Sequence, residues 1–197
     1  CNKLKELGYK GRFVTFGSVF EMGETHEERF FTEEDVLTST CPAPNDYTVS
    51  KRMLSSFVSS YKHDFTHWHF YIPTIYGAGE NPKRLIPYVI NAIRNGEELH
   101  FTAGDQTRQY VHVSEVPRML AQAFDKNLPS GLYNIQGKET VTVKEIVTEI
   151  HHAMGKEVPD GCFGSVQRAD VGMKYLALDG KKLHDATGFE ASIKIID

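Results

Sequence analysis

The sequence has 197 residues, of which 40% are hydrophobic and 24% are charged, as expected for one globular domain or a large part of one. A net charge of −4 without a long basic run argues against nucleic acid as a partner, and no apolar run approaches the roughly 18 residues of a membrane-spanning helix. The three cysteines (Cys1, Cys41 and Cys162) are widely spaced and the nine histidines lack ligand spacing, so we predict no disulfide framework, no metal site and a cytoplasmic location.

The first predicted elements are the end of a helix and a buried strand. Residues 2–9 have the pattern of the last turns of a helix, and residues 12–16 are an apolar run between two glycines, which predicts a strand. Residues 17–23 then form the loop at the carboxyl end of that strand, where open α/β sheets bind ligands. The polar residues 24–44 contain two prolines and predict a long surface loop.

A second helix and a second strand follow. Asn45 or Asp46 can cap the helix, and an apolar stripe at helical period follows, made of Met53, Leu54, Phe57, Val58 and Tyr61. Residues 68–72 predict the next strand. Two strands separated by a helix in this way indicate a parallel sheet and the α/β class.

Tyr47 and Lys51 stand four residues apart on this helix, so both side chains lie on one face. An ammonium group beside a phenol favours the phenolate form, which is how a tyrosine becomes a general acid or base. Because such a pair also occurs by chance in many helices, the pair alone does not establish a catalytic site.

The remainder alternates between helices and strands after a Gly- and Pro-rich loop at 73–82. The predicted helices cover about 83–95, 114–125 and from 143 onward, and the predicted strands cover 99–101, 108–113 and 132–135. Thr142 and Glu145 form a capping box. The end of the chain is expected to be rich in loops, with one short helix between Asp179 and Gly188.

Several motifs resemble one family when taken in order. Ser18 followed by Tyr47-Thr48-Val49-Ser50-Lys51 resembles the Ser…Tyr-x-x-x-Lys site of short-chain dehydrogenases/reductases. Later motifs narrow the resemblance to the extended branch, the NAD-dependent nucleotide-sugar epimerases and dehydratases. These motifs are Ile75-Tyr76-Gly77, Arg84-Leu85-Ile86-Pro87, the run from Gly104 to Val113, and Gly131-Leu132-Tyr133-Asn134-Ile135.

The resemblance implies a partial Rossmann-type parallel sheet that lacks its first strands, with a smaller C-terminal α/β substrate-binding domain. Residues 1–75 would be the C-terminal part of the NAD(P)-binding domain. Residues 76–197 would mainly bind the nucleotide sugar, with some elements returning to the first domain. Because no Gly-rich phosphate loop follows an early strand, we expect the sequence to be part of a longer chain.

The resemblance also implies a role for each site residue. Tyr47 would exchange a proton with a sugar oxygen, Ser18 would hold that oxygen, and Lys51 would promote the phenolate and bind the nicotinamide ribose. The implied contacts to NAD or NADP are Gly17, Tyr47, Lys51, Pro73 and Thr74, and those to a nucleotide-diphosphate sugar are Val19, Arg84, Leu85 and Arg108. The helices at 2–9 and around Tyr47 resemble the pair that forms a homodimer in this family.

Some positions depart from the family pattern. Dehydratases have Asp-Glu directly after the catalytic hydroxyl residue, where this sequence has Val19 and Phe20, so 4,6-dehydration is not expected. Tyr71-Ile72-Pro73-Thr74 replaces the usual Arg-x-Phe-Asn, which puts an asparagine contact to phosphate in doubt, and Gln109 stands where Asp is usual.

The expected function is therefore an NAD(P)-dependent oxidoreductase acting at C4 of a nucleotide-diphosphate sugar. The sequence leaves open whether it is a 4-epimerase or a 4-keto reductase. The alternative is a non-catalytic fragment or nucleotide-sugar binding module, which the lack of a Gly-rich cofactor loop motivates.

Overall fold

Two sheets built mainly of parallel strands form the framework of the computed structural model, which describes residues 2–62, 64–167 and 173–195. The first sheet has the order β1 (Arg12–Ser18), β3 (Thr66–Ile72) and β6 (Gly131–Asn134). The second has the order β2 (Phe30–Phe31), β8 (Tyr175–Leu178), β5 (Thr107–His112) and β4 (Thr74–Tyr76), and β7 (Glu139–Thr142) runs antiparallel to β5. The predicted α/β class with a parallel sheet is confirmed.

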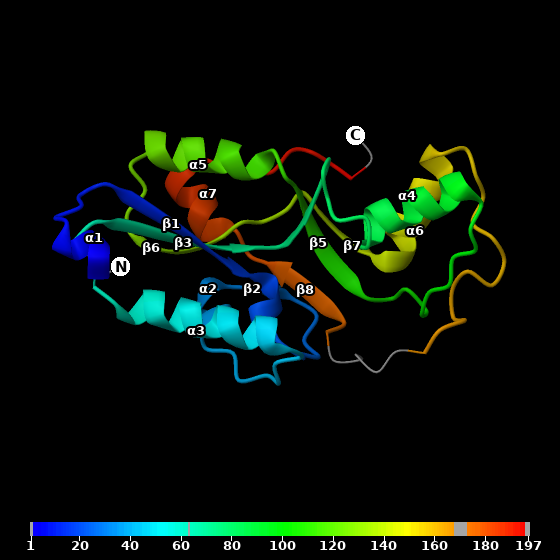
Figure 1. The fold of residues 1–197 in the computed structure, drawn as a ribbon, viewed down its shortest axis with the longest axis horizontal. Coiled ribbons are helices and arrows are strands. Elements are labelled where there is room, and N and C mark those ends of the chain that lie inside the picture. The colour runs from blue at the N-terminus through cyan, green and yellow to red at the C-terminus, as the bar shows by residue number, and fades with distance from the viewer. Residues whose placement is uncertain (1, 63, 168–172, 196–197) are drawn as a thin grey trace.

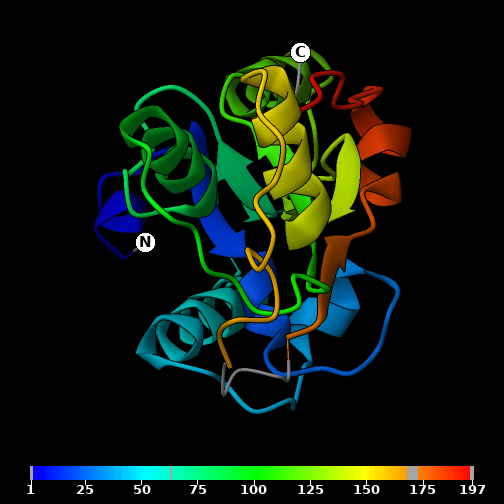
Figure 2. The same cartoon turned by 90° about the vertical axis from the view of Figure 1, so that its right-hand side faces the viewer.

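Helices cover the sheets and fill one end of the molecule. They are α1 (Asn2–Glu6), α2 (Glu33–Leu37), α3 (Asp46–Ser60), α4 (Leu85–Asn95), α5 (Glu115–Asp125), α6 (Val143–Ala153) and α7 (Lys181–Thr187), with a 3₁₀ turn η1 (Val19–Met22). Figure 1 shows α3 on one side of β1 and β3, and α5 and α7 on the other. At the far end α4 and α6 lie side by side, as Figure 2 also shows. No helix among the described residues is long and apolar enough to cross a membrane.

Strand β3 is the centre of the first sheet. Its residues from His67 to Ile72 are all buried, as expected for a parallel strand covered on both faces. Trp68 and Phe70 face the main core with α5 and α7, and the indole Nε1 of Trp68 donates to the carbonyl of Leu128 at 2.8 Å. Burial on both faces therefore places the histidines of this strand inside the protein.

Helix α3 starts where the sequence predicted, but its buried face follows the predicted apolar stripe only in part. Asn45 caps it, because its Oδ1 accepts the amide of Thr48 at 3.0 Å. Thr48, Ser55 and Val58 are buried, whereas Met53 and Phe57 of the predicted apolar stripe are 69% and 46% exposed. The reason is that polar groups lie beneath this helix and hydrogen-bond Ser55.

Three further expectations need correction. The predicted loop at 24–44 contains β2 and α2, which are too short to give a periodic signal. Residues 99–101 form no strand, since only Phe101 makes an isolated bridge, to Phe163. Strands β7 and β8 were not predicted, because their short runs pair only with strands distant in sequence.

The last predicted helix is confirmed as α7. Asp179 Oδ1 accepts the amide of Lys181 at 2.8 Å, and Gly188 ends the helix in the left-handed region at a φ of 75°. Cys41 and Cys162 are free thiols, and Cys1 lies outside the described residues.

Candidate functional site

Ser18 lies where β1 ends and η1 begins. Its backbone is extended, and its Oγ accepts the amide of Phe20 at 3.2 Å. Parallel pairing with β3 aligns Ser18 with Ile72, the residue before Pro73. The carboxyl ends of two neighbouring strands therefore bring Ser18 and Pro73 to the same edge of the sheet.

Helix α3 brings Tyr47 and Lys51 to this edge. Lys51 Nζ donates to the carbonyl oxygen of Phe16, two residues before Ser18, at 2.8 Å. The same ammonium lies 5.8 Å from the centroid of the Tyr47 ring. Tyr47 is 50% exposed, so a ligand can reach its side chain. The structure thus places all three predicted catalytic residues at one edge of the first sheet.

Arg52 fixes the loops around these residues. Its Nε donates to the carbonyl of Glu21 at 2.7 Å, its Nη1 to that of Cys41 at 2.8 Å, and its Nη2 to that of Met22 at 3.0 Å. One guanidinium on α3 therefore holds both the turn after Ser18 and the segment before the helix.

A cavity of about 630 Å³ adjoins this edge, a volume in the range of small-molecule sites. Its lining includes Thr74, Leu85 and Arg108, three of the predicted contacts. Phe20 and Asn45, which stand two residues from Ser18 and Tyr47 respectively, also line it. Ser18, Tyr47 and Lys51 are not themselves on its wall, so the cavity begins beside the predicted catalytic residues.

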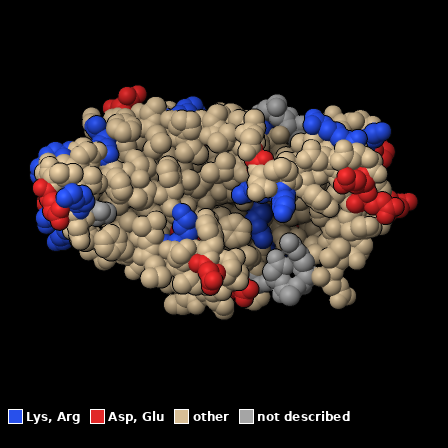
Figure 3. Space-filling model, in the orientation of Figure 1, with Lys and Arg blue, Asp and Glu red and all other residues tan. Residues whose placement is uncertain are grey.

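The cavity combines positive charge with aromatic surface. Lys83 and Arg108 line it, and Arg108 Nη1 also donates to the carbonyl of Thr107 at 2.7 Å. Figure 3 shows Lys and Arg side chains gathered around a hollow near the middle of this face. Aromatic and polar residues that the sequence did not single out complete the wall: Tyr88, His100, Phe101, Gln106 and Tyr110. Burial raises the pKa of Tyr110 to about 12, which keeps its hydroxyl neutral.

Two predicted substrate contacts lie elsewhere. Arg84 Nε pairs with Glu80 at 2.6 Å, and Arg84 is not on the cavity wall. Val19 is only 1% exposed and its side chain belongs to a core cluster with Phe31, which limits it to backbone contacts. Lys83, next to Arg84 in the sequence, takes the position on the wall. The sequence Lys83-Arg84-Leu85 shows two adjacent basic residues at the start of a helix. It does not show which of the two side chains faces the cavity.

Gly17 has a packing reason for being glycine. A Cβ at this position would lie 2.6 Å from Cδ1 of Tyr71 and 2.7 Å from both Oε1 of Glu21 and Nε2 of His69. These three residues are buried. The core beneath the site therefore excludes any side chain at position 17, and a contact of Gly17 with a cofactor stays a prediction.

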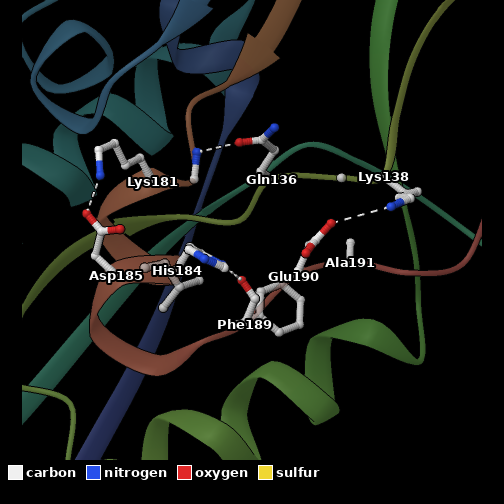
Figure 4. Close-up of a pocket in the computed structure, with 11 residues that line it drawn as sticks. Gln136, Lys138, Lys181, His184, Asp185, Phe189, Glu190 and Ala191 are labelled. Atoms are coloured by element: carbon white, nitrogen blue, oxygen red, sulfur yellow. Dashed lines mark hydrogen bonds and ion pairs between the residues drawn. The ribbon is translucent and has the colours of Figure 1, made fainter.

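A second hollow, of about 430 Å³, lies between α7 and the segment after β6. Figure 4 shows that its charged side chains pair with one another: Lys181 with Asp185 at 2.6 Å, and Lys138 with Glu190 at 3.4 Å. Because these charges are already satisfied, this hollow offers less to an ionic ligand than the cavity beside Tyr47. Within the described part of the chain, no group of three or more His, Cys, Asp or Glu side chains could hold a metal ion.

Comparison with known proteins identifies a family and several relatives. A model of the NAD dependent epimerase/dehydratase family matches residues 1–135. The chain is 27% identical over 142 residues to the dTDP-glucose 4,6-dehydratase of Escherichia coli, which covers 66% of this chain and 37% of that protein.

Solved structures share the fold. The dTDP-glucose 4,6-dehydratase of Bacillus anthracis, in complex with NAD, superposes with a TM-score of 0.80 at 18% identity, over 99% of this chain and 61% of that one. The UDP-N-acetylglucosamine 4-epimerase of Methanobrevibacter ruminantium superposes with a TM-score of 0.76 at 18% identity, over 96% and 60% of the two chains. The chain therefore spans less than two thirds of the length of each of these proteins.

Proposed function

The chain belongs to the NAD dependent epimerase/dehydratase family, and from this premise we propose that the protein is an NAD-dependent oxidoreductase acting at C4 of a nucleotide-diphosphate sugar, as a 4-epimerase or a 4-keto reductase. One observation supports this most directly. Ser18, Tyr47 and Lys51 share one edge of the first sheet, beside a cavity of about 630 Å³ that Arg108 lines.

The residues at this edge fit the nicotinamide end of the cofactor. Lys51 gives one ammonium hydrogen to the carbonyl of Phe16, which leaves two for ribose hydroxyls. Pro73 and Thr74 follow β3 at the same edge, and Thr74 lines the cavity. NAD is proposed over NADP because the superposed B. anthracis enzyme was solved with NAD. When bound, NAD would supply the hydride chemistry needed at C4 of the sugar.

The chain's own groups place the sugar and move its proton. The Tyr47 hydroxyl exchanges a proton with the oxygen at C4, and Ser18 Oγ hydrogen-bonds the same oxygen to keep it in line. Arg108 and Lys83 bind the two phosphates, since cations with several donors match phosphate oxygens. Leu85 supplies apolar contact toward the nucleotide.

Dehydration is not part of the proposal, although the E. coli relative is a 4,6-dehydratase. Elimination needs a second acid and base beside the sugar. The two positions after Ser18 hold Val19, which is buried, and Phe20, which lines the cavity. The next residue, Glu21, is fully buried and hydrogen-bonds inside the core. No carboxylate of this turn therefore lines the cavity.

The test uses the full-length protein with a panel of nucleotide-diphosphate sugars. Stoichiometric loss of reduced-cofactor absorbance supports a reductase, and sugar conversion without net loss supports an epimerase. Tyr47→Phe should lower the rate by at least about 100-fold. Tyr61→Phe at the end of the same helix is the control, since its hydroxyl bonds Asn2 instead. An unchanged rate in Tyr47→Phe overturns the mechanism, and sugar binding without any turnover favours the non-catalytic binding module.

We also propose a homodimer formed by α1 and α3. Leu7, Val49, Met53 and Phe57 are between 45% and 69% exposed, and the hydroxyl of Tyr61 ties α3 to Asn2 of α1 at 3.0 Å. A second copy of the chain would cover this apolar surface. Light scattering of the full-length protein should give a dimeric mass, and the double variant M53D/F57D should give a monomeric one. A monomeric mass for the wild type at micromolar concentration would contradict the proposal.

A further inference from the structure

A glutamate is buried directly beneath the turn that carries Ser18. Glu21 is 0% exposed, its Oε1 accepts the backbone amide of Ser18 at 2.8 Å, and its Oε2 accepts the hydroxyl of Ser55 at 2.6 Å. Burial, the largest influence, raises the pKa of the Glu21 carboxyl group. Ionising a buried glutamate costs free energy, but here both carboxyl oxygens accept hydrogen bonds, which offset part of that cost.

Hydrogen bonds continue from this carboxyl group across the sheet. Ser55 Oγ lies 3.0 Å from Nε2 of His69, and Nδ1 of His69 lies 2.8 Å from Oγ1 of Thr15. Oγ1 of Thr15 lies 2.8 Å from Nε2 of His67. Glu21, Ser55, His69, Thr15 and His67 form an unbroken line, which we name the buried relay.

The far end of the buried relay borders a groove at the surface, although His67 itself is buried. His67 lines a groove of about 420 Å³ together with Val58, Lys62 and Ser130. Its near end lies under the turn of Ser18. The buried relay therefore connects an outer groove with the interior side of the proposed catalytic edge.

Two arrangements of hydrogens satisfy every bond of the buried relay. With Glu21 ionised, each hydrogen points toward it: the Ser55 hydroxyl donates to Glu21, and His69 Nε2–H donates to Ser55. The Thr15 hydroxyl then donates to His69 Nδ1, and His67 Nε2–H donates to Thr15. With Glu21 protonated, all four bonds reverse.

Conversion between the two arrangements moves one proton. The Nε2–H bond of His67 breaks, the O–H bond of Glu21 forms, and each group between them passes on one hydrogen and receives another. His67 begins as the imidazolium, having taken its second ring proton from water in the groove, and ends as the neutral ring with its hydrogen on Nδ1. Glu21 loses its negative charge in the same conversion. The burial of His69 lowers its pKa to about 4, so this ring remains neutral, as a shuttle requires.

We propose that Glu21 is a positioning residue that sets Ser18 for the reaction, and that its carboxyl group exchanges protons with solvent through the buried relay. The inference rests on the proposed function, because Ser18 matters only if it orients a substrate oxygen. The charged and titratable groups that face Glu21 are Lys51 and Arg52 on α3, and His69 and Tyr71 on β3. Glu33 and Glu34 of α2 face Tyr71 in turn.

Kinetics of the full-length protein test the positioning role. Glu21→Leu should lower kcat by about 100-fold with KM within about twofold, because the Ser18 amide loses its acceptor. Glu21→Gln keeps an oxygen for that amide, so it should restore kcat to within about tenfold of wild type. It should also remove from the kcat–pH profile an ionisation that lies above 4.5 in the wild type. Equal losses in both variants, or an unchanged profile in Glu21→Gln, would overturn the positioning role.

Carbon-13 NMR of full-length protein labelled at Glu Cδ and in the histidine rings tests the buried relay without any substrate. The Glu21 signal should titrate above pH 4.5, and the His67 ring should respond at the same pH. Ser55→Ala should move the Glu21 titration to higher pH, because the Ser55 hydroxyl lowers that pKa, and should uncouple His67. The exposed Ser56→Ala on the same helix is the matched control.

Thr15→Val provides a second break of nearly equal volume. It should leave the Glu21–Ser55 bond and the Glu21 titration in place while uncoupling His67. Coupling of His67 to Glu21 that persists in either variant overturns the buried relay. If no sugar is turned over but the NMR coupling behaves as stated, the proposed function fails and the buried relay stands.

Discussion

Removal of the Arg52 guanidinium should release the turn that carries Ser18. Arg52 donates to three backbone carbonyls, of Glu21, Met22 and Cys41, at 2.7–3.0 Å. These acceptors belong to two separate segments, so Arg52→Met disconnects both from α3. The methionine keeps most of the apolar stem, which isolates the loss of hydrogen bonds.

The magnitude follows from the bonds that are lost. A hydrogen bond from a charged donor contributes about 1.5–3 kcal/mol where it is buried, and less here because Arg52 is half-buried and water can replace part of it. Three such bonds together give about 2–4 kcal/mol of unfolding free energy. Urea denaturation of the full-length protein, followed by circular dichroism, should show a midpoint lower by about 1 M or more.

Arg94→Met is the matched control. Arg94 is an exposed arginine in the last turn of α4, and its replacement should move the midpoint little. Limited proteolysis should also cut Arg52→Met faster than wild type within residues 23–44, because that segment loses its anchor. Equal midpoints and equal cleavage rates for the two variants would refute the clamp role assigned to Arg52.

Three further predictions concern the site and its supporting core. Gly17→Ala should destabilise the protein by about 1–3 kcal/mol in thermal unfolding, since its Cβ would lie 2.6 Å from the Tyr71 ring; an unchanged Tm contradicts this. Arg108→Met should raise KM for the nucleotide sugar about tenfold or more with kcat little changed, whereas Arg84→Met should change KM less, because Arg84 is off the cavity wall. The pKa of His69 falls from 6.5 unfolded to about 4 folded, so the stability from its neutral form is present above pH 6.5 and is lost as pH falls toward 4. Between pH 6.5 and pH 4 the wild type should lose up to about 3 kcal/mol more unfolding free energy than His69→Gln. Plots of unfolding free energy against pH that run parallel for the two proteins would contradict this prediction.

The class and order of the main elements could be predicted because local signals carry them. The period of apolar residues marked the long helices and the buried strands, and Asn45 and Gly188 marked where α3 begins and α7 ends. The four-residue spacing of Tyr47 and Lys51 placed both on one face of a helix before any fold was known.

Elements and faces that depend on partners distant in sequence could not be predicted in this way. The short strands β2 and β8 pair with each other, and β8 also pairs with β5. Neither β2 nor β8 has an apolar period of its own that could mark it as a strand. The apolar period predicted Met53 to be a core residue of α3, yet Met53 is 69% exposed. The helix face that is buried carries Ser55, which hydrogen-bonds the buried carboxyl group of Glu21.

By itself, the sequence determined on which kind of element each proposed site residue stands, because this follows from residue type and short-range spacing. Only the tertiary structure decided that Lys83 rather than Arg84 lines the cavity and that Glu21 turns into the core. The physical reason is that a cavity wall and a buried hydrogen-bonded line are made by segments up to 153 residues apart, from Phe20 to Met173. A local sequence pattern does not show which distant segments will pack together.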